Sequence, residues 1–245
     1  MDWIVFKFGN YIFKRPQVLS ENIPSRIQQT AIPRRDGTVI VSPIVLESKI
    51  IQVQEILVGD SIDNLDTQKK ELILELENGE NKLWFRNSRY INCVKQNATF
   101  DYERGTGGKV LRVTIDFLAV DPFVYDGTET IIDQNIETSP QDIIVFNNGD
   151  AQAKPYIKIV AGEDIELLTI INLVNSLTFT YSSLIDGDIL EVDTFKMDVL
   201  LNSLRNFSLF NGNFIKLNSG PNTIRVIGTT ESTFQIKFRG TYYSL

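Results

Sequence analysis

The 245-residue chain contains no histidine and a single cysteine, Cys93, and these two absences exclude most familiar catalytic and metal chemistry. Without histidine there is no Ser-His-Asp or Cys-His nucleophile and no histidine-ligated zinc. One cysteine forms neither an intrachain disulfide nor a paired-cysteine metal or redox motif. We therefore expect a protein that is not an enzyme and that has no catalytic residue, no metal site and no cofactor.

Positive charge and long apolar runs are also scarce. The chain has 24 Lys and Arg against 31 Asp and Glu, a net charge of −7, and its pI is near 4.8. An acidic balance argues against a protein that mainly binds nucleic acid phosphates. No stretch reaches the roughly 18 apolar residues that span a bilayer. The first 16 residues lack the pattern of a signal peptide, since Asp2 and Lys7 interrupt their apolar stretch. We expect a soluble protein, made in a cytoplasm, without a membrane partner.

The sequence does contain segments in which apolar and polar residues alternate with a period of two, which is typical of half-buried strands. The clearest case is residues 109–120, where one face collects Leu111, Val113, Ile115, Phe117 and Ala119. The same pattern recurs in 96–103, 156–160, 177–181, 223–227 and 234–238. Short strands separated by turn residues predict antiparallel sheets, in a sandwich or a barrel.

One segment follows a helical period instead. In residues 61–78, Leu65, Leu72, Ile73 and Leu76 fall on one stripe, with Asp60 or Ser61 placed to cap the start. The fold class predicted is therefore mainly β with one amphipathic helix.

A domain boundary is expected near residues 127–147, where a proline, a glycine and a polar stretch interrupt the strand pattern. We divide the chain into an N-terminal β domain with the helix, residues 1–145, and a C-terminal β domain, residues 146–245. The first carries 16 basic and 21 acidic side chains, a net of −5, and the second 8 and 10, a net of −2.

Two motifs have simpler alternatives. Residues 104–109 resemble a phosphate-binding loop, but Glu103 replaces the first glycine of that motif and Val110 follows the lysine, so a hairpin turn is favoured. Residues 186–193 gather Asp186, Asp188, Glu191 and Asp193. Paired carboxylates cleave glycosides or bind calcium, whereas a tight turn followed by a strand with one solvated face explains the same residues.

A third motif, Arg34-Arg35-Asp36-Gly37, follows Pro33 and precedes the predicted strand 38–41. It is either a charged turn or part of an arm that docks on a neighbouring subunit. Arg34, Arg35 and Asp36 are our candidate subunit-interface residues, and residues 30–43 are the candidate arm.

Several runs, taken in order, resemble one known family. They are Arg35-Asp-Gly-Thr, the run from Phe117 to Tyr125 that contains Asp-Pro-Phe, Asn147-Asn-Gly-Asp with Pro155 and the strand after it, Gly187 to Asp193, and Ser219-Gly-Pro-Asn-Thr-Ile-Arg-Val226. This series is similar to the distal tail proteins of long-tailed, non-contractile phages, the siphovirus tail-component family, over nearly the whole chain.

The resemblance implies an N-terminal domain that forms a homo-hexameric ring at the virion tail tip and a C-terminal galectin-like β-sandwich outside it. The protein, made in the host bacterial cytoplasm, would join the tail tube protein to the tail-associated fibre or lysin protein, and to receptor-binding protein. DNA would pass through the ring without specific binding. An acidic N-terminal half suits such a channel, because like charges repel.

Two other functions fit the same architecture, because fold alone does not fix function. The first is a carbohydrate-binding, lectin-like module that attaches to host cell-surface glycans, with aromatic side chains of the C-terminal half stacking on sugar rings. The second is a glycosidase that uses Asp188 or Glu191.

Overall fold

The chain folds into two compact units, residues 1–124 with 243–245 (unit 1) and residues 125–242 (unit 2). The computed structural model describes residues 5–22, 25–26, 29–31, 38–40, 45–85 and 88–244. Within these ranges the protein is built from antiparallel strands and one helix, so the mainly β class is confirmed. No helix in the described part of the chain has the length and apolar content needed to cross a bilayer.

Unit 1 contains one long antiparallel sheet path, in the order β2-β1-β9-β10-β11-β8-β3. Its strands are β1 (Val5–Phe8), β2 (Tyr11–Ile12), β3 (Gln17–Asn22), β8 (Lys49–Val58), β9 (Asn81–Phe85), β10 (Arg89–Tyr102) and β11 (Val110–Ala119). The predicted hairpin is confirmed, since β10 pairs with β11 from Val94↔Leu118 to Tyr102↔Leu111. The first part of β10 pairs with β9 instead, so this strand joins the two parts of the sheet.

Two short ladders precede β8. They pair β4 (Ser25–Arg26) with β7 (Val45–Leu46) and β5 (Gln29–Ala31) with β6 (Thr38–Ile40). The β5–β6 ladder lies within the candidate arm of residues 30–43. The candidate interface residues Arg34, Arg35 and Asp36 fall outside the residues that the structure describes.

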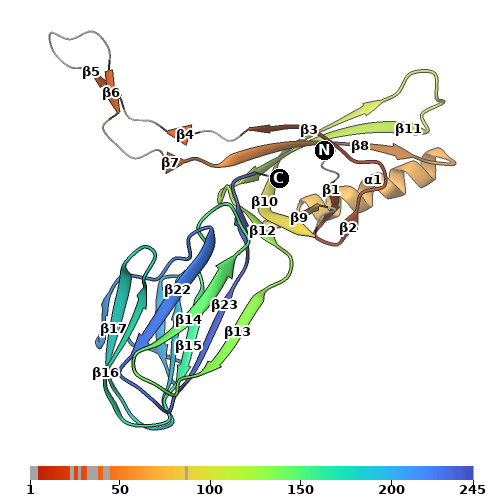
Figure 1. Cartoon of the computed structure of the whole chain (residues 1–245). Helices are drawn as coiled ribbons and strands as arrows, with labels where there is room; N and C mark the ends of the chain where they lie inside the picture. Colours follow the sequence, from red (N-terminus) through yellow and green to blue (C-terminus); the bar gives the residue numbers. More distant parts are fainter. Residues whose placement is uncertain are drawn as a thin grey trace. The chain divides into compact units, whose positions relative to one another are not determined.

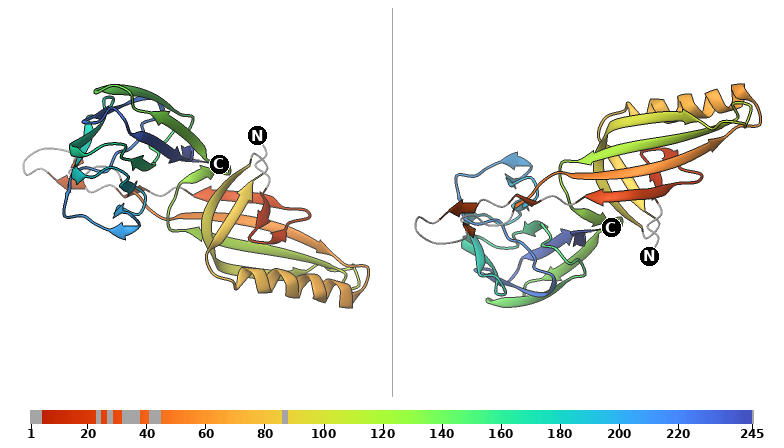
Figure 2. Two further views of the ribbon diagram at one scale, coloured as in Figure 1. Left: turned by 90° about the horizontal axis from the view of Figure 1, so that it is seen from below. Right: turned by 90° about the horizontal axis from the view of Figure 1, so that it is seen from above.

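Helix α1 (Ile62–Leu76) confirms the helix predicted over residues 61–78. It begins at Ser61, whose hydroxyl accepts a hydrogen bond from the Asn64 amide, and it buries Leu65, Leu72 and Leu76. These apolar side chains join the core on the inner face of the long strands, along which the helix runs (Figure 2). The buried rings of Phe8 in β1 and Phe117 in β11 also pack against each other, with centroids 4.8 Å apart.

Unit 2 is a two-sheet antiparallel sandwich, labelled at lower left in Figure 1. One sheet has the order β13-β23-β15-β18-β19-β20, with β13 (Thr130–Asn135), β15 (Tyr156–Val160), β18 (Ile189–Asp193), β19 (Asp198–Leu201), β20 (Leu204–Arg205) and β23 (Thr233–Phe238). The other has the order β14-β22-β16-β17-β21, with β14 (Gln141–Asn147), β16 (Ile165–Asn172), β17 (Leu177–Leu184), β21 (Phe210–Gly212) and β22 (Gly220–Ile227). One apolar core fills the space between the sheets.

The division between the units falls at residues 124 and 125, earlier than the predicted division at 145 and 146. The reason is long-range pairing. β13 pairs along its length with β23, and β14 with β22, so both strands belong to the sandwich although they precede residue 146.

Two further short strands lie where the chain passes between the units, β12 (Val124–Asp126) and β24 (Thr241–Tyr242). Within unit 2, the amide of Asp126 donates to the carbonyl of Gly240 at 3.0 Å. The first and last residues of unit 2 are therefore neighbours.

Candidate functional site

The carboxylates of residues 186–193 do not converge on one point. Asp188 is buried, with 7% of its surface exposed, and its two oxygens accept from the Ile185 amide and the Asn202 side chain, at 3.0 and 2.8 Å. Glu191 lies in β18 between the buried Leu190 and Val192, so its side chain points to the other, outer face. Asp188 therefore serves the turn that precedes β18, whereas Glu191 lies on the outer face of the strand.

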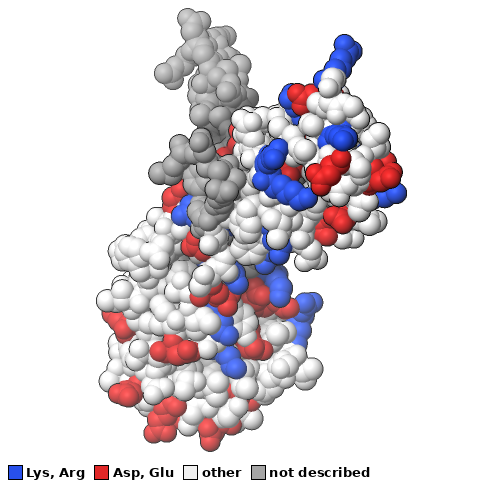
Figure 3. Space-filling model, turned by 90° about the vertical axis from the view of Figure 1, so that its right-hand side faces the viewer, with Lys and Arg blue, Asp and Glu red and all other residues white. Residues whose placement is uncertain are grey.

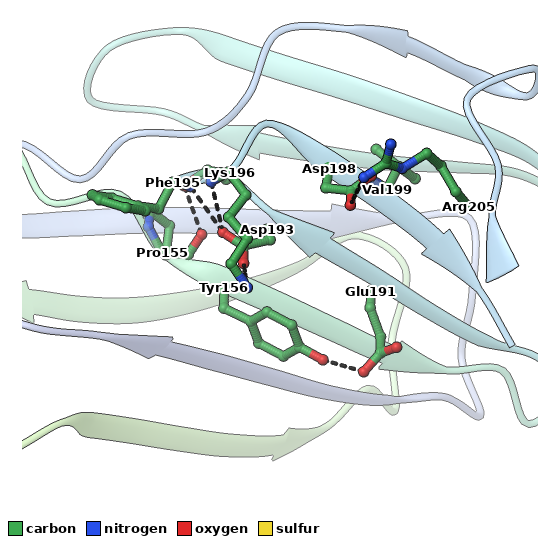
Figure 4. A network of polar contacts seen from close by, with 10 residues as sticks. Pro155, Tyr156, Glu191, Asp193, Phe195, Lys196, Asp198, Val199 and Arg205 are labelled. Atoms are coloured by element: carbon green, nitrogen blue, oxygen red, sulfur yellow. Dashed lines mark hydrogen bonds and ion pairs between the residues drawn. The ribbon is translucent and has the colours of Figure 1, made fainter. Parts of the chain in front are cut away.

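Glu191 has a partner on the neighbouring strand. The Tyr156 hydroxyl donates a hydrogen bond to the Glu191 carboxylate, and the two side chains point toward each other across β15 and β18 (Figure 4). Burial, with this carboxylate as a further cause, raises the pKa of the Tyr156 hydroxyl above its ordinary value. The contact joins two strands on the outer face of the six-stranded sheet.

Asp193 and Asp198 have similar roles at the β18–β19 hairpin. One Asp193 oxygen accepts from the amides of Phe195 and Lys196, both at 3.0 Å, which fixes the turn (Figure 4). Asp198 accepts from the guanidinium of Arg205 at 2.7 Å, and this hydrogen bond lowers the pKa of the Asp198 carboxyl. The interpretation of 186–193 as a turn and a strand with a solvated face therefore agrees with each of these contacts.

The same sheet face has a polar hollow of about 550 Å³. Its lining is drawn from β13, β15 and β23 and the connection after β13: Asp133, Gln134, Asn135, Glu137, Lys158, Val160, Thr233, Phe234 and Gln235. Phe234, the one aromatic residue of this lining, is 1% exposed and packs in the core. The lining of the hollow therefore presents no exposed aromatic ring on which a sugar could stack. The lectin-like alternative requires such a ring.

The glycine-rich segment 104–109 joins two strands, not a strand and a helix. Gly105, Gly107 and Gly108 all have positive φ, between 63° and 82°, a region that side chains disfavour. The glycines are thus explained by the hairpin between β10 and β11, and the phosphate-loop geometry is absent here.

Cys93 is buried in β10, and burial raises the pKa of its thiol. A buried thiol held in its neutral form is a poor nucleophile. Within the described residues, no group of three or more His, Cys, Asp or Glu side chains is placed to hold a metal ion.

Two of the runs that carried the family resemblance, those that begin at Asn147 and Ser219, meet at one end of the sandwich, around three buried asparagines. Asn222 accepts from the side chain of Asn172 and the amide of Asn218, at 3.0 and 2.9 Å, and donates to the Asn218 carbonyl at 2.8 Å. Asn147 donates to the Ala151 carbonyl at 2.9 Å. These amides satisfy loop backbone groups that would otherwise be buried without partners.

A glycine completes this arrangement. A Cβ added to Gly149 would lie 2.2 Å from the carbonyl oxygen of Thr241, so a side chain does not fit there. The Gly149 amide donates to Asn147 at 3.0 Å, and the Ser219 hydroxyl donates to the Gly149 carbonyl at 2.6 Å. The Asn-Asn-Gly-Asp and Ser-Gly-Pro-Asn runs thus join the strand ends, a role that the sequence alone did not reveal.

Unit 1 contains two buried charges that the sequence analysis missed. Lys49 is 0% exposed; its ammonium group forms an ion pair with Glu21 at 2.7 Å and donates to the Tyr243 carbonyl at 2.9 Å. Glu55 accepts from the backbone amides of Lys14 and Arg15, at 2.9 to 3.2 Å. Both were detectable in principle, because they occupy the same alternating positions of β8 as Ile51, Val53 and Leu57.

Comparisons with known proteins agree with these features. Residues 148–242 match the family model described as "Siphovirus-type tail component, C-terminal domain". No curated protein matches the chain. Among solved structures, the chain is similar to the crystal structure of SPP1 Dit (gp 19.1), described as a paradigm of hub adsorption apparatus in Gram-positive infecting phages. That match has a TM-score of 0.69 at 21% identity and covers 98% of this chain and 93% of the other.

The two matches support each other. The family match falls within unit 2 and includes the asparagine-lined end of the sandwich, while the structural match also includes unit 1. The contacts of the acidic cluster are those of a turn and a strand surface. Residues 148–242 therefore resemble the C-terminal domain of siphovirus-type tail components, and the chain shares the fold of SPP1 Dit.

Proposed function

We propose that this chain is the distal tail hub of a siphovirus, a structural protein that forms a homo-hexameric ring at the tail tip. The observation that carries the proposal is the combination of a tail-component family match in unit 2 with a distal-tail-protein fold along 98% of the chain. In this role the ring joins the tail tube protein to the tail-associated fibre or lysin protein and to the receptor-binding apparatus.

Unit 1 supplies the surfaces that a ring requires. A cyclic ring joins two different patches of each subunit, and the free edges of a sheet are natural joining surfaces. The long sheet path of unit 1 has β2 at one end and β3 at the other, so it offers two unlike edges. We place the ring contacts at these edges and at Arg34, Arg35 and Asp36.

The charge of unit 1, which would form the ring, is balanced. Unit 1 carries 16 basic and 16 acidic side chains, because the −5 of residues 1–145 comes from residues 125–145, which belong to unit 2. A net charge of zero supplies no excess positive charge to hold the phosphate backbone. Acidic and basic side chains are interspersed on the face shown in Figure 3, without a broad basic patch there. DNA would then pass through the ring without specific binding.

Negative-stain electron microscopy and light scattering of the purified protein test the proposal. We expect six-fold rings with a central hole and a particle mass of about 167 kDa, six times the 27.8-kDa chain. Replacing Arg34, Arg35 and Asp36 by alanine should reduce the ring fraction. A charge-matched control replaces Lys196, Arg205 and Asp198 of unit 2 and should leave the rings intact. A protein that stays monomeric at all concentrations would contradict the proposal.

A further inference from the structure

The outer face of the five-stranded sheet of unit 2 has an apolar patch at its β14 side. Ile144 is 74% exposed, Phe146 54% and Leu173, which follows β16, 39%. Isolated exposed apolar residues are ordinary, whereas neighbouring ones on a flat sheet indicate a surface that another molecule covers.

The strand register shows that these side chains are neighbours. Ile144 lies opposite Thr223 of β22, and the Leu173 amide donates to the Thr223 carbonyl at 2.9 Å. Phe146 lies opposite Pro221 in the same pair of strands. Side chains directly opposite on one face are about 5 Å apart, so the patch is continuous across β14, β22 and the end of β16.

One side of the patch ends at an ion pair. Asp142 lies opposite Arg225, and the guanidinium donates to both carboxylate oxygens at 2.6 and 2.8 Å. The charges at this border therefore satisfy each other. A molecule that covers the patch needs apolar side chains and no compensating charge.

β14 is also an edge strand, and its one charged residue, Asp142, is paired with Arg225 of the neighbouring strand. Exposed edges are normally shortened, bulged or furnished with charge or proline, because their free backbone groups pair with other strands. Two other edges of unit 2 are shortened, since β20 and β21 have two and three residues. β14 is seven residues long, pairs with β22 without a bulge, and contains no lysine or proline. The free edge and the apolar patch coincide on this one strand.

We propose that β14 binds an extended strand of another tail protein, which lengthens the five-stranded sheet at its free edge and packs alternate, uncharged apolar side chains against Ile144 and Phe146. Backbone hydrogen bonds would supply affinity and the alternate side chains specificity. The inference depends on the proposed function only in identifying the partner as a tail protein. A second copy that paired β14 with β14 would need a two-fold axis, which a single six-fold ring does not contain.

Site-specific photo-crosslinking in assembled virions tests this inference. The photoreactive residue p-benzoylphenylalanine replaces Ile144 in one phage variant. In a matched control it replaces Thr180, which lies on the same outer face in β17, beside the other edge. We expect a crosslink from position 144 and none from position 180. Its mapped site should be a segment of another tail protein with apolar residues at alternate positions.

A second measurement does not depend on the crosslinker. Lysine at both positions 144 and 146 should lower the amount of that partner per tail by about tenfold or more, since lysine opposes strand addition and apolar burial is lost. Thr180→Lys should retain the partner. Both variants should unfold at the wild-type temperature, because the replaced side chains are on the surface.

Microscopy of the same variants separates the two proposals. A crosslink to a second copy, or no crosslink in tails whose rings are intact, would overturn the β14 inference alone. The absence of rings in the wild-type protein would instead remove the proposed function.

Discussion

Lys49 and Glu55 lie on the buried face of one strand, β8, but their charges are stabilised in different ways. Lys49 has a carboxylate partner, Glu21, whereas Glu55 is held by the amides of Lys14 and Arg15. Burial raises the pKa of the Glu55 carboxyl, and the two amides oppose this effect only in part. The folded protein therefore favours the protonated form of Glu55 more than the unfolded chain does.

This difference predicts a pH dependence of stability. A carboxyl whose pKa is raised by folding stabilises the protein below its unfolded value, about 4.3, and this contribution is lost as pH rises through the folded pKa. Glu55→Gln keeps an oxygen for the two amides but has no charge to bury. We expect the melting temperature of the wild type, relative to that of the variant, to fall as pH increases from about 4 to 8.

The measurement is thermal unfolding across that pH range, and the composition of the chain simplifies its interpretation. Because the chain has no histidine, imidazole titration does not contribute between pH 5 and 8. Glu71→Gln, at an exposed position of α1, is the matched control and should follow the wild type. Parallel pH profiles for wild type and Glu55→Gln would show that Glu55 does not contribute.

At the scale of elements, α1 depends on local contacts at its first turn. The Ser61 hydroxyl accepts from the Asn64 amide at 3.2 Å, which satisfies one of the free amides at the helix start. Ser61→Ala should lower the free energy of unfolding by about 1 kcal/mol in chemical denaturation. Ser61→Asp keeps an acceptor and adds a negative charge near the helix N-terminus, so it should retain wild-type stability. An alanine variant as stable as the wild type would contradict this role of Ser61.

The same local signals explain which elements the sequence predicted. The helix and the β10–β11 hairpin followed from periodicity, a capping residue and glycines, all of which act over a few residues. The compact units divide at residues 124 and 125, and not at 145 and 146 where the sequence was divided, because β13 and β14 pair with β23 and β22, which lie some 80 to 100 residues later. The residue pattern within a strand does not indicate which distant strand it pairs with.

The site residues show the same limit. The carboxylates of 186–193 were correctly interpreted as a turn and a strand, since alternation alone separates Glu191 from its buried neighbours. The asparagine contacts of Asn147 and Asn222 were not predicted, because a buried amide has no periodic signature and its partners come from distant loops. The interface assignment of Arg34, Arg35 and Asp36 remains a prediction.

At the scale of the whole molecule, the boundaries of unit 2 predict which fragment folds. The fragment 125–242 contains both sheets, and its ends are joined by the hydrogen bond from Asp126 to Gly240. We expect it to unfold in one cooperative transition, followed by circular dichroism. The fragment 146–245, cut at the division that the sequence suggested, lacks β13 and all of β14 except Phe146 and Asn147, so it leaves β23 and most of β22 without those partners. It should show no cooperative transition, and equal behaviour of the two fragments would contradict the assignment.

The contact between Lys49 and the Tyr243 carbonyl has a consequence for synthesis. These residues are 194 positions apart, yet both belong to unit 1. A ribosome that adds about 5 to 20 residues per second needs roughly 10 to 40 seconds to travel from one to the other. During that time the buried ammonium group lacks one of its partners, while all of unit 2 emerges and folds. Unit 1 is therefore completed last although it begins first, so a nascent chain does not yet present finished surfaces to neighbouring copies.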